Sequence, residues 1–165
     1  VIPLDYVQKI KNSSNFQAGM ATLRQIGLGK IDMGWHATAL DNAKTLENDF
    51  IAFESSQLNG IDLYPSVDGC CVSTSFSHIF QGGYSSGYYS YKWAEVIEAD
   101  AFEAFKEMGI FNSKVPHKFR DHILSSGGSE HPSLLYRKFR GKDATIDALL
   151  NRAGLIQDQK INSKS

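Results

Sequence analysis

The residues best suited to chemistry lie in one short segment, "SFSHIFQGGYSSGYYSYKW", which runs from residue 75 to residue 93. It holds four of the chain's seven tyrosines, just after a histidine, His78. These tyrosines are Tyr84, Tyr88, Tyr89 and Tyr91. A phenol has a pKa of about 10, so it stays a hydrogen-bond donor at neutral pH and can meet a developing oxyanion. Imidazole can donate in the same way or carry a proton.

Three glycines separate these groups, namely Gly82, Gly83 and Gly87. Glycine is costly to order and allows positive φ angles, so it suits a loop that moves while it presents donors. A loop that only caps a hydrophobic core is the alternative, since aromatic side chains are most often packing residues. Aromatic faces also stack on bases in single-stranded nucleic acids, but the segment has no Lys or Arg before Lys92.

Other chemistries have weaker support in this sequence. A zinc site needs spaced ligands, and the two nearest histidines, His117 and His122, are five residues apart, which does not share a helical face. No His-Glu-x-x-His motif occurs. The serines of "GYSSG" do not follow a predicted strand, and nothing local supports a pairing of a cysteine with His78. The pairs "GLG" and "GG" lack the context of a phosphate-binding loop.

Composition excludes several classes of function. The chain has 165 residues and a formal net charge of −1, which is too balanced for a protein that grips a phosphate backbone or an anionic membrane. Its apolar fraction of 42% suits one globular domain. Cys70 and Cys71 are adjacent, and a bridge between neighbours is strained, so we expect free thiols. Free thiols favour a reducing compartment, hence the cytoplasm.

The elements that must position the tyrosines are predicted to be helices. Period-2 alternation never persists long enough to indicate a sheet, and apolar residues recur at helical spacing. The sequence therefore predicts an all-α, mostly helical fold with a Gly/Tyr-rich loop. The predicted helices cover residues 4–11, a long stretch after Ser13 and Ser14 that includes four glycines, and residues 41–58, 88–108, 114–124, 129–139 and 144–153.

Two stretches of the chain resemble a known family. The stretch "FSHIFQGGYSSGYYSYKWAEVIEADAFEAFKEMGIFN" and the later "FRDHILSSGGSEHPSLLYRKFRGKDATIDALLNRAGL" are similar to the C-terminal part of the thimet oligopeptidase family. That family includes oligopeptidase A and the peptidyl-dipeptidases, or dipeptidyl carboxypeptidases. The resemblance is specific from Phe76 to Leu155, and "NFQAGMATLRQIGLGKIDMGWH" is similar to the stretch that precedes it.

The resemblance implies a two-lobed, almost entirely helical zinc metallopeptidase that hydrolyses short peptides. Its zinc ligands and general base would lie upstream of Val1, so this chain would be a C-terminal piece with no metal ligands of its own. Residues 1–155 would form a helical subdomain of the catalytic region, and residues 156–165 a polar tail. This piece alone would be inactive, and it would expose a face through which it could self-associate.

The family's His-x-x-Gly-Gly-Tyr…Tyr pattern assigns roles to particular residues. His78, Tyr84 and Tyr91 would be catalytic, as ligands of the transition state. Gly82, Gly83 and Tyr88 would line the substrate channel, and Tyr89 would be packing. The expected partners are short peptides and the missing N-terminal part of the enzyme, with no nucleic acid and no membrane. The alternative is a free-standing helical module that binds peptides or a partner protein without catalysis.

Overall fold

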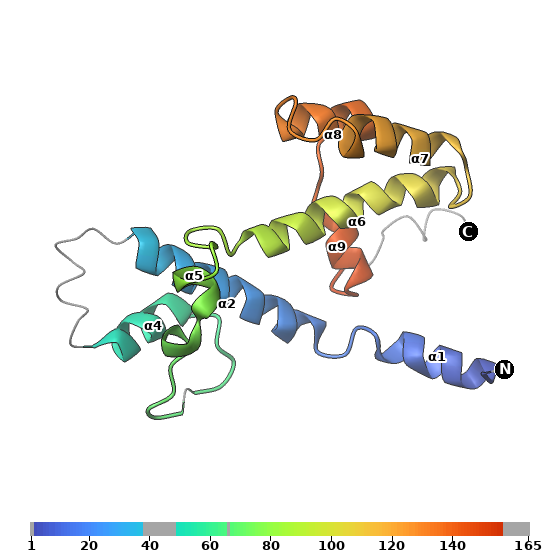
Figure 1. Cartoon of the computed structure of the whole chain (residues 1–165). Coiled ribbons are helices and arrows are strands. Elements are labelled where there is room, and N and C mark those ends of the chain that lie inside the picture. Colours follow the sequence, from blue (N-terminus) through green and yellow to red (C-terminus); the bar gives the residue numbers. More distant parts are fainter. Residues whose placement is uncertain (1, 38–48, 66, 157–165) are drawn as a thin grey trace. The chain divides into compact units, whose positions relative to one another are not determined.

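The computed structural model of the protein describes residues 2–37, 49–65 and 67–156, and within these ranges it contains helices and loops but no strand (Figure 1). The predicted all-α class is confirmed. Helices in these ranges are too short or too polar to cross a membrane. The chain divides into two compact units, Val1–Lys92 and Trp93–Ser165. This division is finer than the length of the chain predicts.

The described part of the first unit is built from helices, turns and loops. Its elements are α1 (Leu4–Ser13), α2 (Ala18–Ala37), α4 (Phe50–Leu58), the 3₁₀ turn η1 (Ser73–Ser75), the short α5 (Ser77–Phe80) and the first turn of α6 (Ser90–Met108). The hydrophobic core joins α2 to the segment around α5, and it contains Leu28, Ile31, Phe76 and Ile79. Ile79 is completely buried, which fixes α5 against α2.

Glycines in α2 allow α4 to pack closely. A Cβ atom added at Gly27 would lie 2.9 Å from a methyl group of Leu58, and one added at Gly34 would lie 2.8 Å from the side chain of Gln57. Both partners belong to α4, which lies beside α2 in Figure 1. At these two positions the close neighbours of α2 are therefore side chains, not backbone atoms, of α4. Each glycine still disfavours the helix by about 1 kcal/mol relative to alanine.

A buried glutamate ties the turn before α5 to α4. The carboxylate of Glu54 accepts hydrogen bonds from the amides of Val72 and Ser73, at 2.8 and 2.7 Å, and from the Ser73 hydroxyl at 2.6 Å. Burial raises the pKa of this carboxyl, but the hydrogen bonds from Ser73, Val72 and Cys71 together outweigh it and lower the pKa. Trp35 of α2 donates to the Ser73 hydroxyl at 2.9 Å and so completes the link to α2.

The second unit packs the rest of α6 against shorter helices. Its other elements are α7 (Lys114–Phe119), the π-helical turn η2 (Arg120–Leu124), α8 (Pro132–Arg140) and α9 (Asp147–Arg152). The core is built from buried residues of α6, α7 and α8, with aromatic rings in edge-to-face contact. These residues are Ala101, Ala104, Val115, Tyr136 and Phe139.

A buried charge network joins α6 to α8. Asp100 is 2% exposed and accepts a hydrogen bond from the Tyr136 hydroxyl at 2.6 Å. The guanidinium of Arg140 lies 3.2 Å from Asp100 and also binds both carboxylate oxygens of Glu107 at 2.7 and 2.8 Å. Burial, with the hydrogen bond to Asp100, raises the pKa of Tyr136. The network satisfies a carboxylate that the core would otherwise exclude.

The observed boundaries differ from the predicted ones at several helix ends. The helix predicted to follow Ser13 and Ser14 as caps begins only at Ala18, because α1 extends to Ser13 and Gln17 adopts a positive φ of 56°. The helix predicted over residues 129–139 begins at Pro132, and His131 is its cap. The last helix begins at Asp147, not residue 144.

Two further predictions concern stretches that lie partly outside the described residues. The helix predicted over residues 41–58 is observed as α4 from Phe50, with Asp49 as its cap. Residues 41–48 lie outside the described residues, as do residues 157–165 of the predicted polar tail. The predictions for those two stretches therefore stay predictions.

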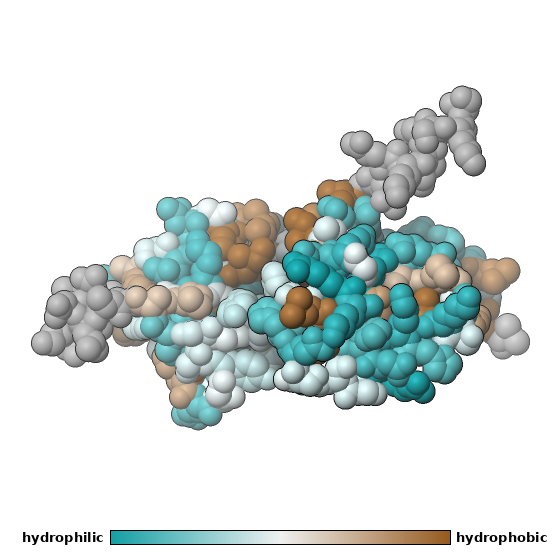
Figure 2. Space-filling model, turned by 90° about the horizontal axis from the view of Figure 1, so that it is seen from above, coloured by the Kyte–Doolittle hydropathy of each residue, from teal (hydrophilic) through white to brown (hydrophobic). Residues whose placement is uncertain are grey.

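Many large hydrophobic side chains are exposed on both units, and Figure 2 shows several of them as brown patches among polar residues. In the first unit the most exposed include Leu4 at 85%, Phe16 at 78% and Tyr64 at 76%. Phe111 in the second unit is fully exposed.

Candidate functional site

The predicted site residues lie on α5, on the loop that follows it and on the first turn of α6. We call residues 81–89 the tyrosine loop. It folds back on α5: the Tyr84 amide donates to the main-chain oxygen of His78 at 3.2 Å, and the Ser85 hydroxyl donates to that of Ile79 at 2.6 Å. Because Ile79 is buried in the core, this return path places the loop against a fixed support.

The histidine and three of the tyrosines form one aromatic cluster. The ring of His78 lies 6.2 Å from the ring of Tyr84 and 6.0 Å from that of Tyr88. Tyr91 stacks on Tyr84 at 5.2 Å and meets Tyr88 edge to face at 5.1 Å. The structure therefore brings together four of the residues that the sequence singled out. Tyr89 takes no part in this cluster: it is 56% exposed, and its backbone passes the α2 helix at Gly29.

The cluster presents polar groups at the surface. His78 is exposed, and Tyr91 is 40% exposed, while Tyr84 and Tyr88 are half-buried. A hydrogen bond with the Tyr84 hydroxyl, together with burial, raises the pKa of Tyr91 above its usual value of 10. The Tyr91 phenol is thus firmly neutral at physiological pH. Neighbouring phenols of this kind can donate hydrogen bonds to a group that gains negative charge.

Glycine is required at the two glycine positions of the predicted site for different structural reasons. A Cβ atom added at Gly82 would lie 2.9 Å from the main-chain oxygen of His78 and 3.0 Å from its Cα. Gly82 is therefore required by close backbone approach. Gly83 has free space around it but a φ of 77°, which glycine adopts without strain. The turn between His78 and Tyr84 depends on both residues.

Sequence reasoning missed the residue that receives the tyrosine loop. Asp32 of α2 is completely buried, and its carboxylate accepts hydrogen bonds from the amides of Ser86 and Tyr88 at 2.9 and 2.8 Å. The imidazole Nδ1 of His36 lies 2.8 Å from the main-chain oxygen of Asp32 and 2.8 Å from the same carboxylate. The available signal was an aspartate next to Ile31 and one turn after Leu28, on the apolar face of a helix.

A cysteine–histidine pair receives no support from the geometry. The thiol of Cys71 donates to Glu54 at 3.1 Å, and burial, with this hydrogen bond, raises its pKa. A raised pKa makes a thiol less nucleophilic at neutral pH. Cys70 and Cys71 are both free of disulfides.

The described residues do not offer a set of metal ligands. Within residues 2–37, 49–65 and 67–156, no three His, Cys, Asp or Glu side chains gather at distances that would hold an ion. A catalytic zinc normally takes three protein ligands. The residues of these ranges therefore do not fit the zinc that the family resemblance implies, and its predicted upstream ligands stay a prediction.

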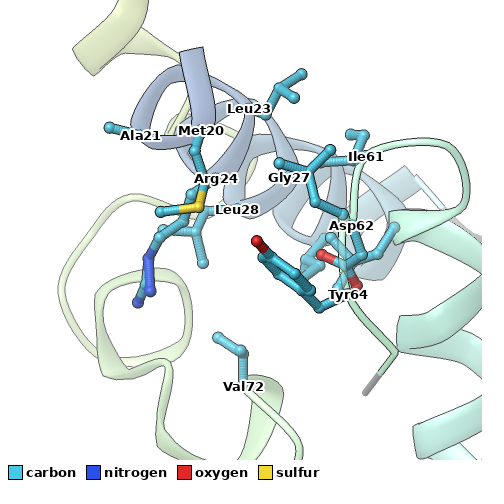
Figure 3. Close-up of a pocket in the computed structure, with 13 residues that line it drawn as sticks. Met20, Ala21, Leu23, Arg24, Gly27, Leu28, Ile61, Asp62, Tyr64 and Val72 are labelled. Atoms are coloured by element: carbon cyan, nitrogen blue, oxygen red, sulfur yellow. The ribbon is translucent and has the colours of Figure 1, made fainter. Parts of the chain in front are cut away.

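The first unit also has an apolar hollow of about 450 Å³ between α2 and the loop after α4. Figure 3 shows Arg24 reaching along it from α2 and the ring of Tyr64 reaching in from the loop. Leu28 and Val72 form part of its lining, so the hollow lies beside the core that supports α5. Its lining is mainly hydrophobic and suits an apolar side chain.

The sequence of the chain is similar to those of known proteins. The model of peptidase family M3 matches residues 1–155. Oligopeptidase A of Haemophilus influenzae is 42% identical over 155 residues, and oligopeptidase A of Escherichia coli is 41% identical over 156 residues. Dipeptidyl carboxypeptidase of Escherichia coli is 34% identical over 154 residues.

These matches cover most of the chain but a small part of each relative. They include 94%, 93% and 93% of this chain, respectively, and 22% of each of the three relatives. The chain thus spans about one fifth of the length of the curated relatives it matches. Since the family model extends over nearly the whole sequence, the chain belongs to peptidase family M3.

Proposed function

We propose that this chain is the C-terminal part of the catalytic region of a zinc metallopeptidase that hydrolyses short peptides. Residues 1–155 form the helical subdomain in this proposal, and the polar tail follows them. The zinc ligands and the general base belong to residues that this chain does not contain. The single observation that carries the proposal is the cluster of His78, Tyr84, Tyr88 and Tyr91 at an accessible surface.

In the proposed reaction these residues act on the substrate's carbonyl oxygen. When the peptide carbon is attacked by water, it becomes tetrahedral and its oxygen gains negative charge. The phenol of Tyr84, supported by Tyr91, donates a hydrogen bond to that oxygen, and His78 donates a second one or carries a proton. A donor aimed at the charged oxygen binds the transition state more strongly than the ground state, so it lowers the barrier.

The substrate's backbone is the proposed contact of Gly82, Gly83 and Tyr88. Gly83 has no side chain and no neighbour within 4 Å of the place a Cβ would take, so the backbone of a peptide can approach it closely. Tyr88 borders the same cluster through its ring. The proposed partners are therefore short peptides, together with the part of the enzyme that carries the zinc. We place this enzyme in the cytoplasm, since both cysteines are free thiols.

The variant Tyr84→Phe tests the proposed catalytic role in the complete enzyme that contains this segment. Under conditions where chemistry limits turnover, we expect kcat to fall by about 100- to 1,000-fold while KM changes little. Tyr89→Phe is the matched control, because Tyr89 lies outside the cluster and should keep full activity. An unchanged kcat for Tyr84→Phe would refute the role of this hydroxyl.

A second candidate function is a helical module that binds peptides or a partner protein without catalysis. The apolar hollow beside α2 favours it, since it is large enough for a hydrophobic side chain. The purified 165-residue chain distinguishes the two candidates. We expect it to show no chelator-sensitive peptide hydrolysis and no tight peptide binding. Tight binding of peptides would favour the module, and zinc-dependent hydrolysis would refute the assignment of the metal ligands to another part of the enzyme.

A further inference from the structure

Asp32 is a buried carboxylate whose hydrogen-bond donors come mainly from the tyrosine loop. It is completely buried, although it lies 54 and 56 residues from the two amides that it binds. One carboxylate oxygen accepts from the Ser86 amide and the other from the Tyr88 amide. The two contacts therefore hold both ends of a three-residue stretch of the loop.

The stretch held in this way has a strained backbone. Ser86 has a φ of 57°, a left-handed conformation that residues other than glycine rarely adopt. Such a conformation persists only when its surroundings determine it. The hydrogen bond from the Ser86 amide to Asp32 is part of those surroundings, and the adjacent Gly87 amide bonds back to the Tyr84 main-chain oxygen at 2.8 Å. The conformation of the loop is thus coupled to the position of Tyr84.

The buried Asp32 carboxylate and the tyrosine loop depend on each other. A buried carboxylate without donors is very unfavourable, so Asp32 requires the loop amides and His36. Hydrogen bonds to a charged acceptor are about twice as strong as neutral ones. The ring of His36 also contacts Phe80 of α5 at 5.9 Å, which connects this group to the helix that carries His78.

We propose that Asp32 is a positioning residue that fixes the tyrosine loop in the conformation that aligns Tyr84 and Tyr91. Asp32 does not contact the substrate. It acts through two main-chain amides, so its effect reaches the reaction by the placement of the phenols. This inference rests on the proposed function of those phenols, but the loop's dependence on Asp32 is testable without any activity.

Hydrogen exchange on the 165-residue chain tests the positioning itself. In the native chain the amides of Ser86 and Tyr88 should exchange slowly. In Asp32→Asn, an NH₂ group would replace one acceptor oxygen and face a main-chain N–H donor. We therefore expect the main-chain amides of Ser86 and Tyr88 to exchange at least about tenfold faster. The exposed Asp68→Asn is the control and should change neither rate. Equal rates in the native chain and Asp32→Asn would overturn the proposal. If Asp32→Asn does not fold, fast exchange of both amides in the native chain would overturn it equally.

Kinetics of the complete enzyme test the route from Asp32 to the reaction. A misplacement of about 1 Å can cost about 100-fold in rate, so Asp32→Asn should lower kcat by about 10- to 100-fold with little change in KM. In a Tyr84→Phe background the same change should lower kcat by less than about threefold, because the phenol it positions is gone. Equal effects in both backgrounds would overturn the proposal. If Tyr84→Phe alone leaves kcat unchanged, the proposed function fails, and the exchange experiment decides the role of Asp32.

Discussion

The two units each bury an aspartate on a long helix, and they satisfy it in different ways. Asp32 in the first unit is bound by the main-chain amides of Ser86 and Tyr88 and by a histidine. Asp100 in the second unit is bound by the side chains of Arg140 and a tyrosine. The first carboxylate therefore shapes a loop, while the second joins one helix to another.

A change at each aspartate should therefore affect a different property of the molecule. A carboxylate paired with a guanidinium contributes to the packing of α6 and α8, and its loss leaves a buried charge without its partner. A carboxylate that receives amides determines the local path of the chain. We therefore expect the second unit to lose stability when its aspartate's partner is removed. The first unit should lose the precise conformation of its loop.

The largest expected effect is on stability, in the second unit. Arg140→Met should lower the free energy of unfolding by about 3–5 kcal/mol, because Asp100 keeps only the Tyr136 hydroxyl and a lysine 4.0 Å away. Chemical denaturation measures this loss. Arg137→Met is the control, since its partner Asp143 lies at the surface, and it should change little. A loss no larger than that of the control would contradict the claim that the Asp100–Arg140 pair stabilises the second unit.

A smaller effect is expected at Glu54, which, like Asp32, is a carboxylate that accepts hydrogen bonds from main-chain amides. Glu54→Gln should cost about 2 kcal/mol, the size of a hydrogen bond to a charged group. Because folding lowers the pKa of Glu54, its contribution is complete above the unfolded value of 4.5 and is lost as the pH falls below it. Denaturation from pH 7 downwards should thus show a shallower loss in Glu54→Gln than in the native chain. The same slope in both would contradict this role, and the exposed Glu130→Gln should follow the native curve.

The smallest effect concerns the tight turn of the tyrosine loop. Gly82→Ala places a Cβ 2.9 Å from the His78 main-chain oxygen and should cost about 1 kcal/mol of stability. Gly128→Ala is the control, because no atom lies within 4 Å of its added Cβ. Thermal unfolding of both variants makes the comparison. Identical unfolding midpoints would show that the backbone at His78 can shift without loss of stability. The conformation of the tyrosine loop would then be less tightly fixed than the hydrogen bonds to Asp32 indicate.

The sequence predicted the helical class and most of the helices, because each depends on local spacing. Composition drew attention to the His/Tyr/Gly segment, but only the family resemblance separated Tyr89 from the other three tyrosines. The sequence missed Asp32, whose role depends on amides more than fifty positions away. The left-handed Ser86 was beyond prediction, since only the fold around it explains that conformation.

The most direct test of the central claim is the binding of a phosphinic peptide, whose tetrahedral phosphorus group mimics the charged transition state. In the complete enzyme, Tyr84→Phe should raise the Kd of this compound by about 100- to 1,000-fold, in parallel with the fall in kcat/KM. The KM of the matching substrate should change little. A Kd equal to that of the native enzyme would contradict the claim that the tyrosine loop binds the transition state.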